Sequence, residues 1–342
     1  MLRLTPELSK RLRHSQAPIP IMPSSPVVVV GSIMQDLSLA CAEFPLAGQT
    51  ILGRLKVGQG GKGSNQAIAC GRTGVGTTFV GAMGRDAYAA QVEAFYRREG
   101  IGCRLALKSG VPTGTAVILL NRRGQNMIAI DPGANTRLAR ADIPPALMRN
   151  ARVVVAQLEA NPQASGHALR LARRAGAVAI LNPAPMCDDF DASLLRHVDI
   201  LIPNESEFVA LVRRLAGSRR TKFDEAALHR LSPGELHALC RRFEVPTLII
   251  TLGSRGCFIS SPEGSHALPA HRGMRVVDTT GAGDAFCGGF AAGLVRHDGD
   301  VVAAARLGTA VAALSITKAG AADAMPTRRE LERFLKKRGV VS

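Results

Sequence analysis

The chain has 342 residues, of which 46% are hydrophobic and only 4% aromatic, and it lacks tryptophan. These values predict one large α/β domain with an aliphatic core and room for a small appendage. No apolar run reaches the roughly 20 residues that a membrane helix needs, so we expect no membrane partner. The formal net charge is +16, but the basic residues are dispersed as arginine pairs without an aromatic-interleaved patch, so we expect no nucleic-acid partner.

Cysteine and histidine usage bears on the compartment and on metal sites. The seven cysteines are scattered and include no CxxC pair, and the histidines form no ligand-spaced cluster. This pattern indicates a reducing, cytoplasmic compartment and argues against a disulfide framework or a zinc site. Any metal is therefore expected to be held by carboxylates, backbone oxygens and phosphates.

Residues 1–25 differ from the rest of the chain. They are basic and rich in proline, and they lack the apolar segment of a secretory signal. A transit peptide is an alternative, although Glu7 and the prolines argue against it. We expect a flexible or weakly docked N-terminal tail before a domain that spans residues 26–338.

The first predicted element of that domain is a buried parallel strand. Val27–Val30 is a β-branched run closed by Gly31, and such runs are typical of strands covered on both faces. The polar residues 32–36 follow its carboxyl end, where α/β proteins place ligands. Gly60–Asn65 is a glycine-rich turn that leads into small helical residues up to Cys70. The turn carries a lysine and an asparagine but lacks the spacing of a Walker A loop.

Two hairpins predict a small separate sheet. Residues 37–57 alternate in hydrophobicity and are broken in the middle by proline and glycine, as a hairpin is. Thr113–Leu120 and Gln125–Ile130 flank an Asn-Arg-Arg-Gly turn. Strands from segments 34–57 and 107–131 are therefore expected to form one sheet that projects from the main domain, covers a site and offers a dimer surface.

Strands and helices alternate regularly beyond residue 150. A polar or glycine-rich group follows each predicted strand, so these groups are expected at one edge of a mostly parallel sheet. Residues 216–232 are polar and irregular, which predicts a surface insertion. The predicted strands are Thr77–Gly81, Val153–Ala156, Ala177–Leu181, Ile200–Ile202 and Leu248–Ile250, and the predicted helices are Ala87–Arg98, residues 162–175, Val301–Thr317 and Thr327–Lys337.

The segment Asp278–Phe286 carries the clearest chemistry. Gly281 and Gly283 permit a sharp turn that exposes N–H groups, and the helix that begins there adds a positive dipole end. Such a turn binds anionic oxygens, for example those of a phosphoryl group in transfer. Asp284 would repel a phosphate, so its presence indicates a general base that takes a proton from an attacking hydroxyl. Taken alone, the segment also fits a βα turn that is capped by an aspartate.

From about residue 26 to 338 the chain resembles the ribokinase (PfkB) family of sugar kinases. Several motifs occur in the family's order, and Asp278–Phe286 resembles its C-terminal signature. The other motifs are Gly31-Ser32-Ile33 with Asp36, Gly60–Asn65, Leu181–Pro185, Pro203–Glu207 and Thr251–Gly256. The resemblance implies a three-layer α/β/α fold with a mostly parallel sheet and a small β-sheet lid. It also implies an ATP-dependent kinase that phosphorylates the O5 hydroxyl of a pentose.

The resemblance assigns roles to individual residues. Asp284 matches the general base, and Gly281, Ala282 and Gly283 match the anion hole for the transferring phosphoryl group. The positions that match sugar contacts are Met34, Gln35, Asp36, Gly61, Lys62, Gly63, Ser64, Asn65, Glu159 and Asp284. Those that match the nucleotide site are Asn204, Glu207, Thr251, Leu252, Gly253, Ser254, Arg255, Gly256, Gly283 and Thr309.

Cofactors and assembly follow from the same resemblance. Asn204 and Glu207 match a motif that handles nucleotide phosphates and Mg²⁺ through water, whereas Thr309 stands where relatives often have a histidine against adenine. A K⁺ loop is implied at Asp278, Thr280, Ser315, Lys318, Gly320 and Ala324, mostly through backbone carbonyls. Ala324 departs from the hydroxyl side chain that is common there. We expect ATP, Mg²⁺ and K⁺ as cofactors, and a homodimer that forms through the lid sheet.

Met34 is the departure that bears on the sugar. The ribokinase pattern is Ser-Ile-Asn-x-Asp, whereas this chain has Ser32-Ile33-Met34-Gln35-Asp36. Losing an amide that would bond the C2/C3 hydroxyl edge costs about 1–3 kcal/mol for a sugar that carries the hydroxyl. We hypothesise that 2-deoxy-D-ribose is accepted as well as D-ribose or better. Alternatively, Met34 only packs and ribose binds through Asp36, or the chain is a kinase for another sugar or a nucleoside, or a non-catalytic sugar sensor.

Overall fold

The computed structural model describes residues 25–123, 125–186, 190–215 and 223–339. The predicted N-terminal tail, except for Ser25, lies outside these ranges. Gly124 of the second predicted hairpin and residues 216–222 of the predicted insertion also lie outside them. Within the described ranges, no helix is both long enough and apolar enough to cross a membrane.

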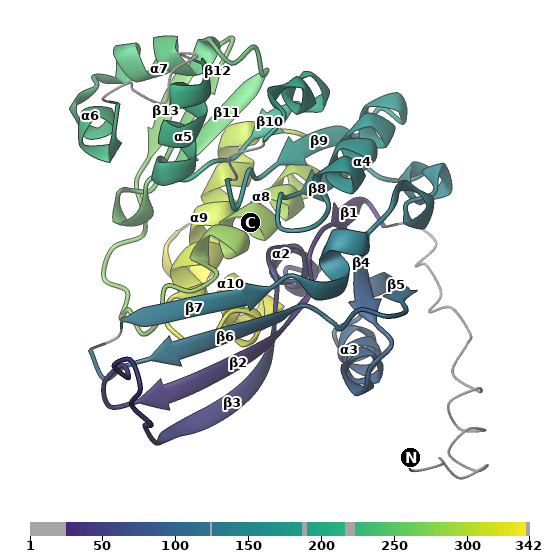
Figure 1. The fold of residues 1–342 in the computed structure, drawn as a ribbon. Helices are drawn as coiled ribbons and strands as arrows, with labels where there is room; N and C mark the ends of the chain where they lie inside the picture. Colours follow the sequence, from purple (N-terminus) through teal and green to yellow (C-terminus); the bar gives the residue numbers. More distant parts are fainter. Residues whose placement is uncertain (1–24, 124, 187–189, 216–222, 340–342) are drawn as a thin grey trace.

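A nine-stranded sheet forms the middle layer of the molecule (Figure 1). Its order is β13-β12-β11-β10-β9-β8-β1-β4-β5. The strands from β11 to β5 run parallel, and β12 and β13 add an antiparallel hairpin at one edge. The strands are β1 (Val27–Val30), β4 (Thr77–Gly84), β5 (Gly102–Lys108), β8 (Val153–Ala156), β9 (Val178–Leu181), β10 (Ile200–Leu201), β11 (Thr247–Thr251), β12 (Cys257–Ser261) and β13 (Gly264–Leu268).

Alternate residues of this sheet enter two hydrophobic cores. Val27 and Val29 of β1 pack on one side, and Val28 and Val30 pack on the other. The first side is covered by α2 (Lys62–Arg72), α3 (Ala87–Arg98), α8 (Ala282–Arg296), α9 (Val301–Ser315) and α10 (Arg328–Lys337). The second is covered by α4 (Pro162–Arg174), α5 (Glu205–Leu215), α6 (Glu225–Arg230) and α7 (Pro233–Arg241). The predicted three-layer α/β/α fold with a mostly parallel sheet is confirmed.

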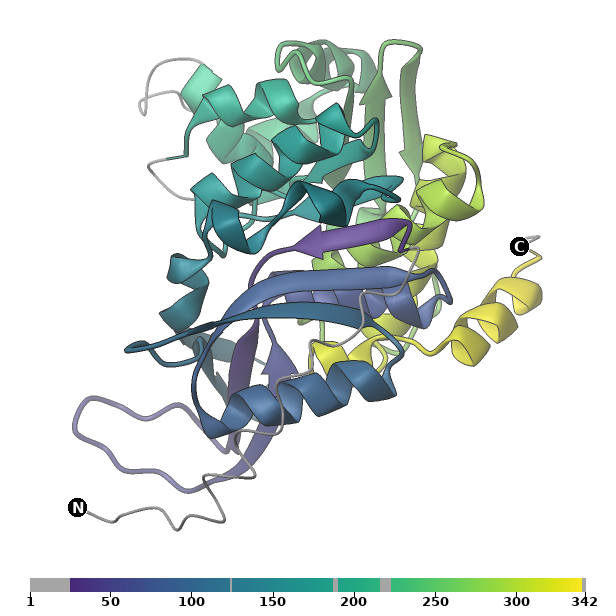
Figure 2. The ribbon, with the colours of Figure 1, turned by 90° about the vertical axis from the view of Figure 1, so that its right-hand side faces the viewer.

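The small sheet has the order β3-β2-β6-β7 and projects from the layered body (Figure 1). Its strands are β2 (Met34–Cys41), β3 (Gly53–Gly60), β6 (Thr115–Leu120) and β7 (Asn126–Asp131). The loop between β2 and β3 extends it still farther from the body (Figure 2). The expected segment 107–131 is corrected at its start, because Leu107 and Lys108 end β5 of the main sheet.

The predicted insertion is not irregular throughout. Asp224 Oδ1 accepts a hydrogen bond of 2.7 Å from Ala227 N–H and thereby caps α6. Ser232 caps α7 in a reciprocal capping box with Glu235. Aspartate and serine satisfy the open N–H groups at the start of a helix. Because residues 216–232 are polar throughout, these caps were not recognised in the sequence. The prediction of an irregular segment is therefore wrong for residues 225–230.

Close packing of α8 against α2 positions the site. A Cβ atom on Gly288 of α8 would collide with the backbone oxygen of Gln66 on α2. Only glycine permits this approach, because it has no side chain to keep the two backbones apart. Both helices begin at the same edge of the molecule, so the first turn of α8 lies beside the first turn of α2.

Candidate active site

Asp284 lies in the first turn of α8 and is buried, with 7% of its surface exposed. Asn65 Nδ2 donates to Asp284 Oδ2 at 3.0 Å, and Gln66 Nε2 donates to Oδ1 at 2.9 Å. Both oxygens of the carboxyl group therefore act as hydrogen-bond acceptors, and the two amides fix its orientation. Asn65 Oδ1 is buried without a hydrogen-bond partner among the described residues, so it can accept a bond from a bound hydroxyl.

The turn before α8 leaves backbone N–H groups open. Gly281 has a φ of 75°, in the left-handed region that glycine adopts readily. Within the described ranges, the backbone N–H groups of Gly281, Gly283 and Asp284 donate no hydrogen bond. Ala282 N–H donates to Thr279 O at 3.2 Å. The tight turn therefore uses the Ala282 donor itself, and the expected role of Ala282 in an anion hole stays a prediction.

A cavity of about 170 Å³ lies against this turn. Its walls include Lys62, Asn204, Glu207, Thr251, Cys287 and residues 281–284. Burial would lower the pKa of Lys62, but the carboxylates of Asp284, Glu159 and Glu207 raise it. The ammonium group therefore stays charged within reach of any anion that enters the cavity.

Glu159 fixes the start of α2. Its Oε2 accepts hydrogen bonds from Ser32 Oγ at 2.6 Å and from the backbone N–H of Lys62 at 2.8 Å. A carboxylate at the first N–H groups of a helix is stabilised by the helix dipole. The loops after β1 and β8 and the glycine-rich turn, with Gly61 and Gly63, therefore meet at one point of the sheet edge.

Asp36 on β2 lies close to this point. Burial raises its pKa to about 7, and the negative charges of Glu159, Asp284 and Asp323 act in the same direction. Each of these effects disfavours the charged carboxylate. Asp36 is therefore half-protonated near neutral pH and can both donate and accept hydrogen bonds, as a polyol requires.

Met34 projects from the same face of β2 as Asp36, because side chains alternate along a strand. Only 1% of its surface is exposed, and it packs with Ala116 and Ile118 of the small sheet. The thioether offers no N–H donor at this position. The surface of β2 beside Asp36 is therefore apolar.

Two residues that were expected to contact sugar have side chains that point elsewhere. Ser64 is buried, and its Oγ accepts a hydrogen bond of 2.8 Å from Tyr96 OH in the core. Gln35 lies on the face of β2 opposite Asp36, next to its strand partners Gln59 and Thr115. The periodicity of the helix and of the strand sets the direction of each side chain, and a sequence motif does not contain this information.

Asn204 and Glu207 form a reciprocal pair at the start of α5. Glu207 N–H donates to Asn204 Oδ1 at 2.8 Å, and Asn204 N–H donates to Glu207 Oε2 at 2.9 Å. Burial raises the pKa of Glu207 to about 7, although the Asn204 N–H group and the charge of Lys62 counteract it. Both side chains line the cavity beside Lys62, where they can act on phosphates through water.

A second, mostly apolar cavity of about 480 Å³ adjoins the first, with Thr251, Thr279, Ala282 and Gly283 lining both. Gly253, Ser254, Gly256 and Thr309 also line it. Leu252 packs against the core, and Arg255 forms an ion pair with Glu205 and contacts His229, so neither lines the cavity. Acidic and apolar partners outside the cavity hold these two side chains, and the expected nucleotide contact of both residues stays a prediction.

Comparison with known proteins agrees with this geometry. Residues 24–328 match the pfkB family of carbohydrate kinases. The chain belongs to this family. Among its relatives, a ribokinase of Mus musculus is 34% identical, with 89% of this chain and 93% of the relative covered. A deoxyribokinase of Salmonella typhi is 31% identical, with 90% and 98% covered. The structure of Arabidopsis thaliana ribokinase complexed with ribose and ATP is 30% identical, with a TM-score of 0.77 and coverage of 92% and 99%.

The kinase carries an ordered loop at the positions expected to hold K⁺. Asp278 Oδ1 accepts Thr280 N–H and Oδ2 accepts Gly320 N–H, both at 2.9 Å. Five carbonyl oxygens of this loop accept no hydrogen bond within the described ranges: those of Asp278, Thr280, Lys318, Gly320 and Ala324. The carbonyl of Ser315 accepts Lys318 N–H at 3.3 Å, and the Ser315 hydroxyl bonds its own helix.

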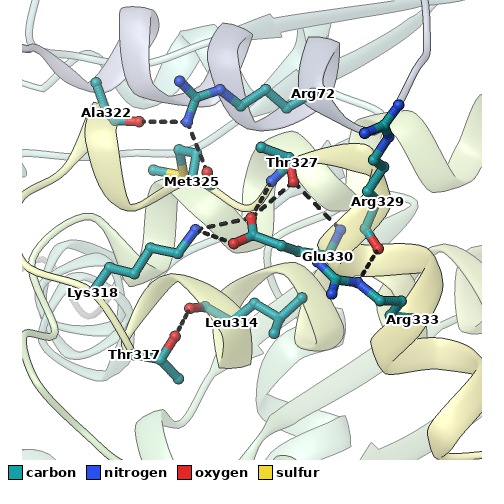
Figure 3. Close-up of polar contacts among 10 residues, drawn as sticks. All are labelled: Arg72, Leu314, Thr317, Lys318, Ala322, Met325, Thr327, Arg329, Glu330 and Arg333. Carbon is teal, nitrogen blue, oxygen red and sulfur yellow. Dashed lines mark hydrogen bonds and ion pairs between the residues drawn. The ribbon is translucent and has the colours of Figure 1, made fainter.

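Side chains around this loop fix it from two sides (Figure 3). Arg72 of α2 donates to the carbonyl oxygens of Ala322 and Met325, at 3.1 and 2.7 Å. Lys318 forms an ion pair of 2.7 Å with Glu330 of α10. The open carbonyl oxygens therefore belong to a loop that is held in place from two sides.

Sequence reasoning missed several residues of the kinase site. Gln66 donates directly to Asp284, and Gln157 donates to Gln66; no motif rule singled them out. Ala312, Ala313 and Ile316 line the larger cavity with Thr309. These four residues have the spacing i, i+3, i+4, i+7 of one helix face. From Thr309, this spacing could have predicted the other three residues of the cavity wall.

Proposed function

We propose that this kinase transfers the γ-phosphoryl group of ATP to the O5 hydroxyl of D-ribose or 2-deoxy-D-ribose. The observation that carries the proposal is the position of Asp284. Its carboxylate is held by two amide donors beside the open N–H groups of Gly281 and Gly283, and it lines the smaller cavity together with Lys62. The relatives named ribokinase and deoxyribokinase support the choice of a pentose.

In this proposal Asp284 takes the proton of the attacking hydroxyl. The O5–phosphorus bond forms as the bond from phosphorus to the β,γ-bridging oxygen breaks, and ADP leaves. The N–H groups of Gly281 and Gly283, together with the α8 dipole, stabilise the charge on the transferring oxygens. Lys62 lies in the same cavity and neutralises part of that charge. Asn65, Asp36 and Glu159 orient the sugar.

Two metal ions fit this site in different ways. Asn204 and Glu207 line the smaller cavity and would hold Mg²⁺ through water, and the ion would supply positive charge for the phosphates of ATP. K⁺ fits the braced loop at Asp278, Thr280 and Gly320, whose open carbonyl oxygens match a hard cation. The K⁺ proposal is tested by comparing velocities in K⁺ and in a large organic cation at equal ionic strength. A higher velocity in K⁺ supports it, and equal velocities contradict it.

Met34 bears on the choice between the two sugars. It is buried on the sugar side of β2 with no donor to offer a 2-hydroxyl group. D-ribose therefore loses a hydrogen bond that 2-deoxy-D-ribose does not need. We propose that the 2-deoxy sugar is used at least as efficiently as ribose.

The small sheet is the proposed dimer surface of a cytoplasmic enzyme. Leu55, Val57, Val117 and Met127 are between 44% and 57% exposed. Strand pairing places them on one face, opposite to the face that carries Asp36. A continuous apolar sheet face on a water-exposed lid is typical of a protein interface.

An activity screen tests the function as a whole. Release of ADP is measured with ribose, 2-deoxyribose, fructose and nucleosides, and the phosphorylated position is identified by NMR. The proposal predicts turnover with one or both pentoses and a product phosphorylated at O5. Preference for fructose or a nucleoside would contradict the substrate class, and failure of every sugar to stimulate ADP release would indicate a sensor.

A further inference from the structure

Gln66 touches the proposed base but lies outside every expected set of site residues. It follows Asn65 on α2 and is fully buried. Its Nε2 donates to Asp284 Oδ1 at 2.9 Å and to Asn182 Oδ1 at 3.0 Å. Both hydrogens of the amide are therefore used, one on the base and one on the loop after β9.

The orientation of this amide is fixed by its surroundings. Asn182 Nδ2 donates to the carbonyl oxygen of Ile202 at 2.8 Å, which turns Asn182 Oδ1 toward Gln66. Gln66 therefore faces two oxygens, and only its nitrogen can do so without repulsion. On the other side, Gln66 Oε1 accepts a hydrogen bond of 2.7 Å from Gln157 Nε2, and Gln157 is also fully buried.

We infer that Gln66 is a positioning residue that fixes the orientation of the Asp284 carboxyl group, and that Gln157 holds Gln66 in turn. An amide N–H can only donate, so Asp284 Oδ1 must accept the bond from Gln66 Nε2. It also fixes the plane of the carboxyl group, which sets the lone pair that meets the attacking hydroxyl. The inference rests on the proposed role of Asp284 as the base.

Gln66→Glu is the sharpest test, because it keeps the shape and replaces the donor by an acceptor. Two carboxylates at hydrogen-bond distance do not both ionise near neutral pH, so they share a proton and the base is less available. We expect kcat to fall about 50-fold or more at pH 7, with both KM values within about 3-fold of wild type. The acid limb of the kcat–pH profile is expected to move up by about one pH unit or more.

Gln66→Met and Gln157→Leu complete the series. Gln66→Met removes the donor without adding a charge, so kcat is expected to fall about 10-fold or more. Gln157→Leu acts one step farther away, and a smaller fall in the same direction is expected. Thr78→Val is the control, since it removes a different buried hydrogen bond, from Thr78 Oγ1 to Ser25 Oγ, and is expected to leave the pH profile unchanged.

The outcomes separate this inference from the proposed function. If Asp284→Asn abolishes turnover but Gln66→Glu keeps the wild-type pH profile and kcat, the positioning role is contradicted and the base remains. If Asp284→Asn remains active, the proposed base itself is contradicted. A fall in kcat for Gln66→Glu with an equal loss in Thr78→Val would show general destabilisation and would also overturn the inference.

Discussion

Asn65 Nδ2 lies 3.0 Å from Asp284 Oδ2, across 219 positions of the sequence. This contact joins the glycine-rich turn before α2 to the glycine-rich turn before α8. It forms because Gly288 lets α8 approach the backbone of Gln66. The donor that would orient a sugar hydroxyl and the carboxylate that would deprotonate it therefore belong to one hydrogen-bonded unit.

Gly288→Ala is expected to separate these two helices. A methyl group there would collide with the backbone oxygen of Gln66, and overpacking of this kind costs about 1–3 kcal/mol. Because the strain lies directly behind Asp284, kcat is expected to fall about 10-fold or more even at temperatures where the variant is folded. Gly234→Ala on α7 is the matched control, since no atom lies within 4 Å of the added carbon. Loss of stability without loss of kcat in Gly288→Ala would contradict this account.

Asp36 is expected to make sugar binding depend on pH. Burial and the neighbouring negative charges raise its pKa to about 7, so the carboxyl group becomes protonated as the pH falls below that value. A protonated Asp36 is a weaker acceptor for a sugar hydroxyl, and the KM for the pentose should therefore rise between about pH 8 and pH 6. In Asp36→Asn the KM should be higher at every pH and should lose this dependence. A wild-type KM that stays constant over the range would contradict the prediction.

Met34→Asn is expected to shift the sugar preference toward ribose. The amide restores a donor and an acceptor next to Asp36, and one hydrogen bond to a 2-hydroxyl group is worth about 1–3 kcal/mol. The ratio of kcat/KM for ribose over 2-deoxyribose should therefore rise about 5- to 150-fold relative to wild type. A wild-type enzyme that strongly prefers ribose, with a ratio unchanged in the variant, would refute the role assigned to Met34.

Glu330 is expected to stabilise the fold around Lys318 above acidic pH. Burial opposes ionisation, but hydrogen bonds from Lys318 and Thr327 lower its pKa to about 2. A carboxyl group with a lowered folded pKa stabilises the fold above its unfolded pKa, and that contribution is lost as the pH falls toward the folded value. Glu330→Gln should therefore lower Tm by about 2–4 °C at pH 7, and the difference in Tm should narrow between about pH 5 and pH 2. Glu332→Gln, in an exposed pair with Arg328, should leave Tm unchanged.

The sequence was sufficient for the layers and for the edge of the sheet where the site lies. The β-branched run Val27–Val30 predicted a buried parallel strand, and two hairpin patterns predicted the small sheet. It was insufficient for the direction of individual side chains. Ser64 contacts Tyr96 in the core because of its position on α2. Arg255 pairs with Glu205, which lies 50 positions earlier in the sequence. Such contacts depend on which helices pack together, and local motifs do not contain that information.

The contacts that hold Asp284 could likewise not be predicted from local sequence. Gln66 and Gln157 are ordinary polar residues in sequence, and their role arises only when α2 and β8 converge on α8. The apolar wall of the larger cavity was within reach, because Thr309, Ala312, Ala313 and Ile316 share one helical face. The N-caps of α6 and α7 could also have been predicted, because an aspartate and a serine stand directly before these helices.

The most direct test of the central claim is the turnover of Asp284→Asn with saturating ATP and pentose. Asparagine keeps the size of the side chain but cannot take a proton from the hydroxyl. With both substrates still bound, kcat for phosphorylation at O5 is expected to fall about 10²- to 10⁴-fold. A folded Asp284→Asn variant that phosphorylates the pentose at close to the wild-type rate would contradict the assignment of Asp284 as the base.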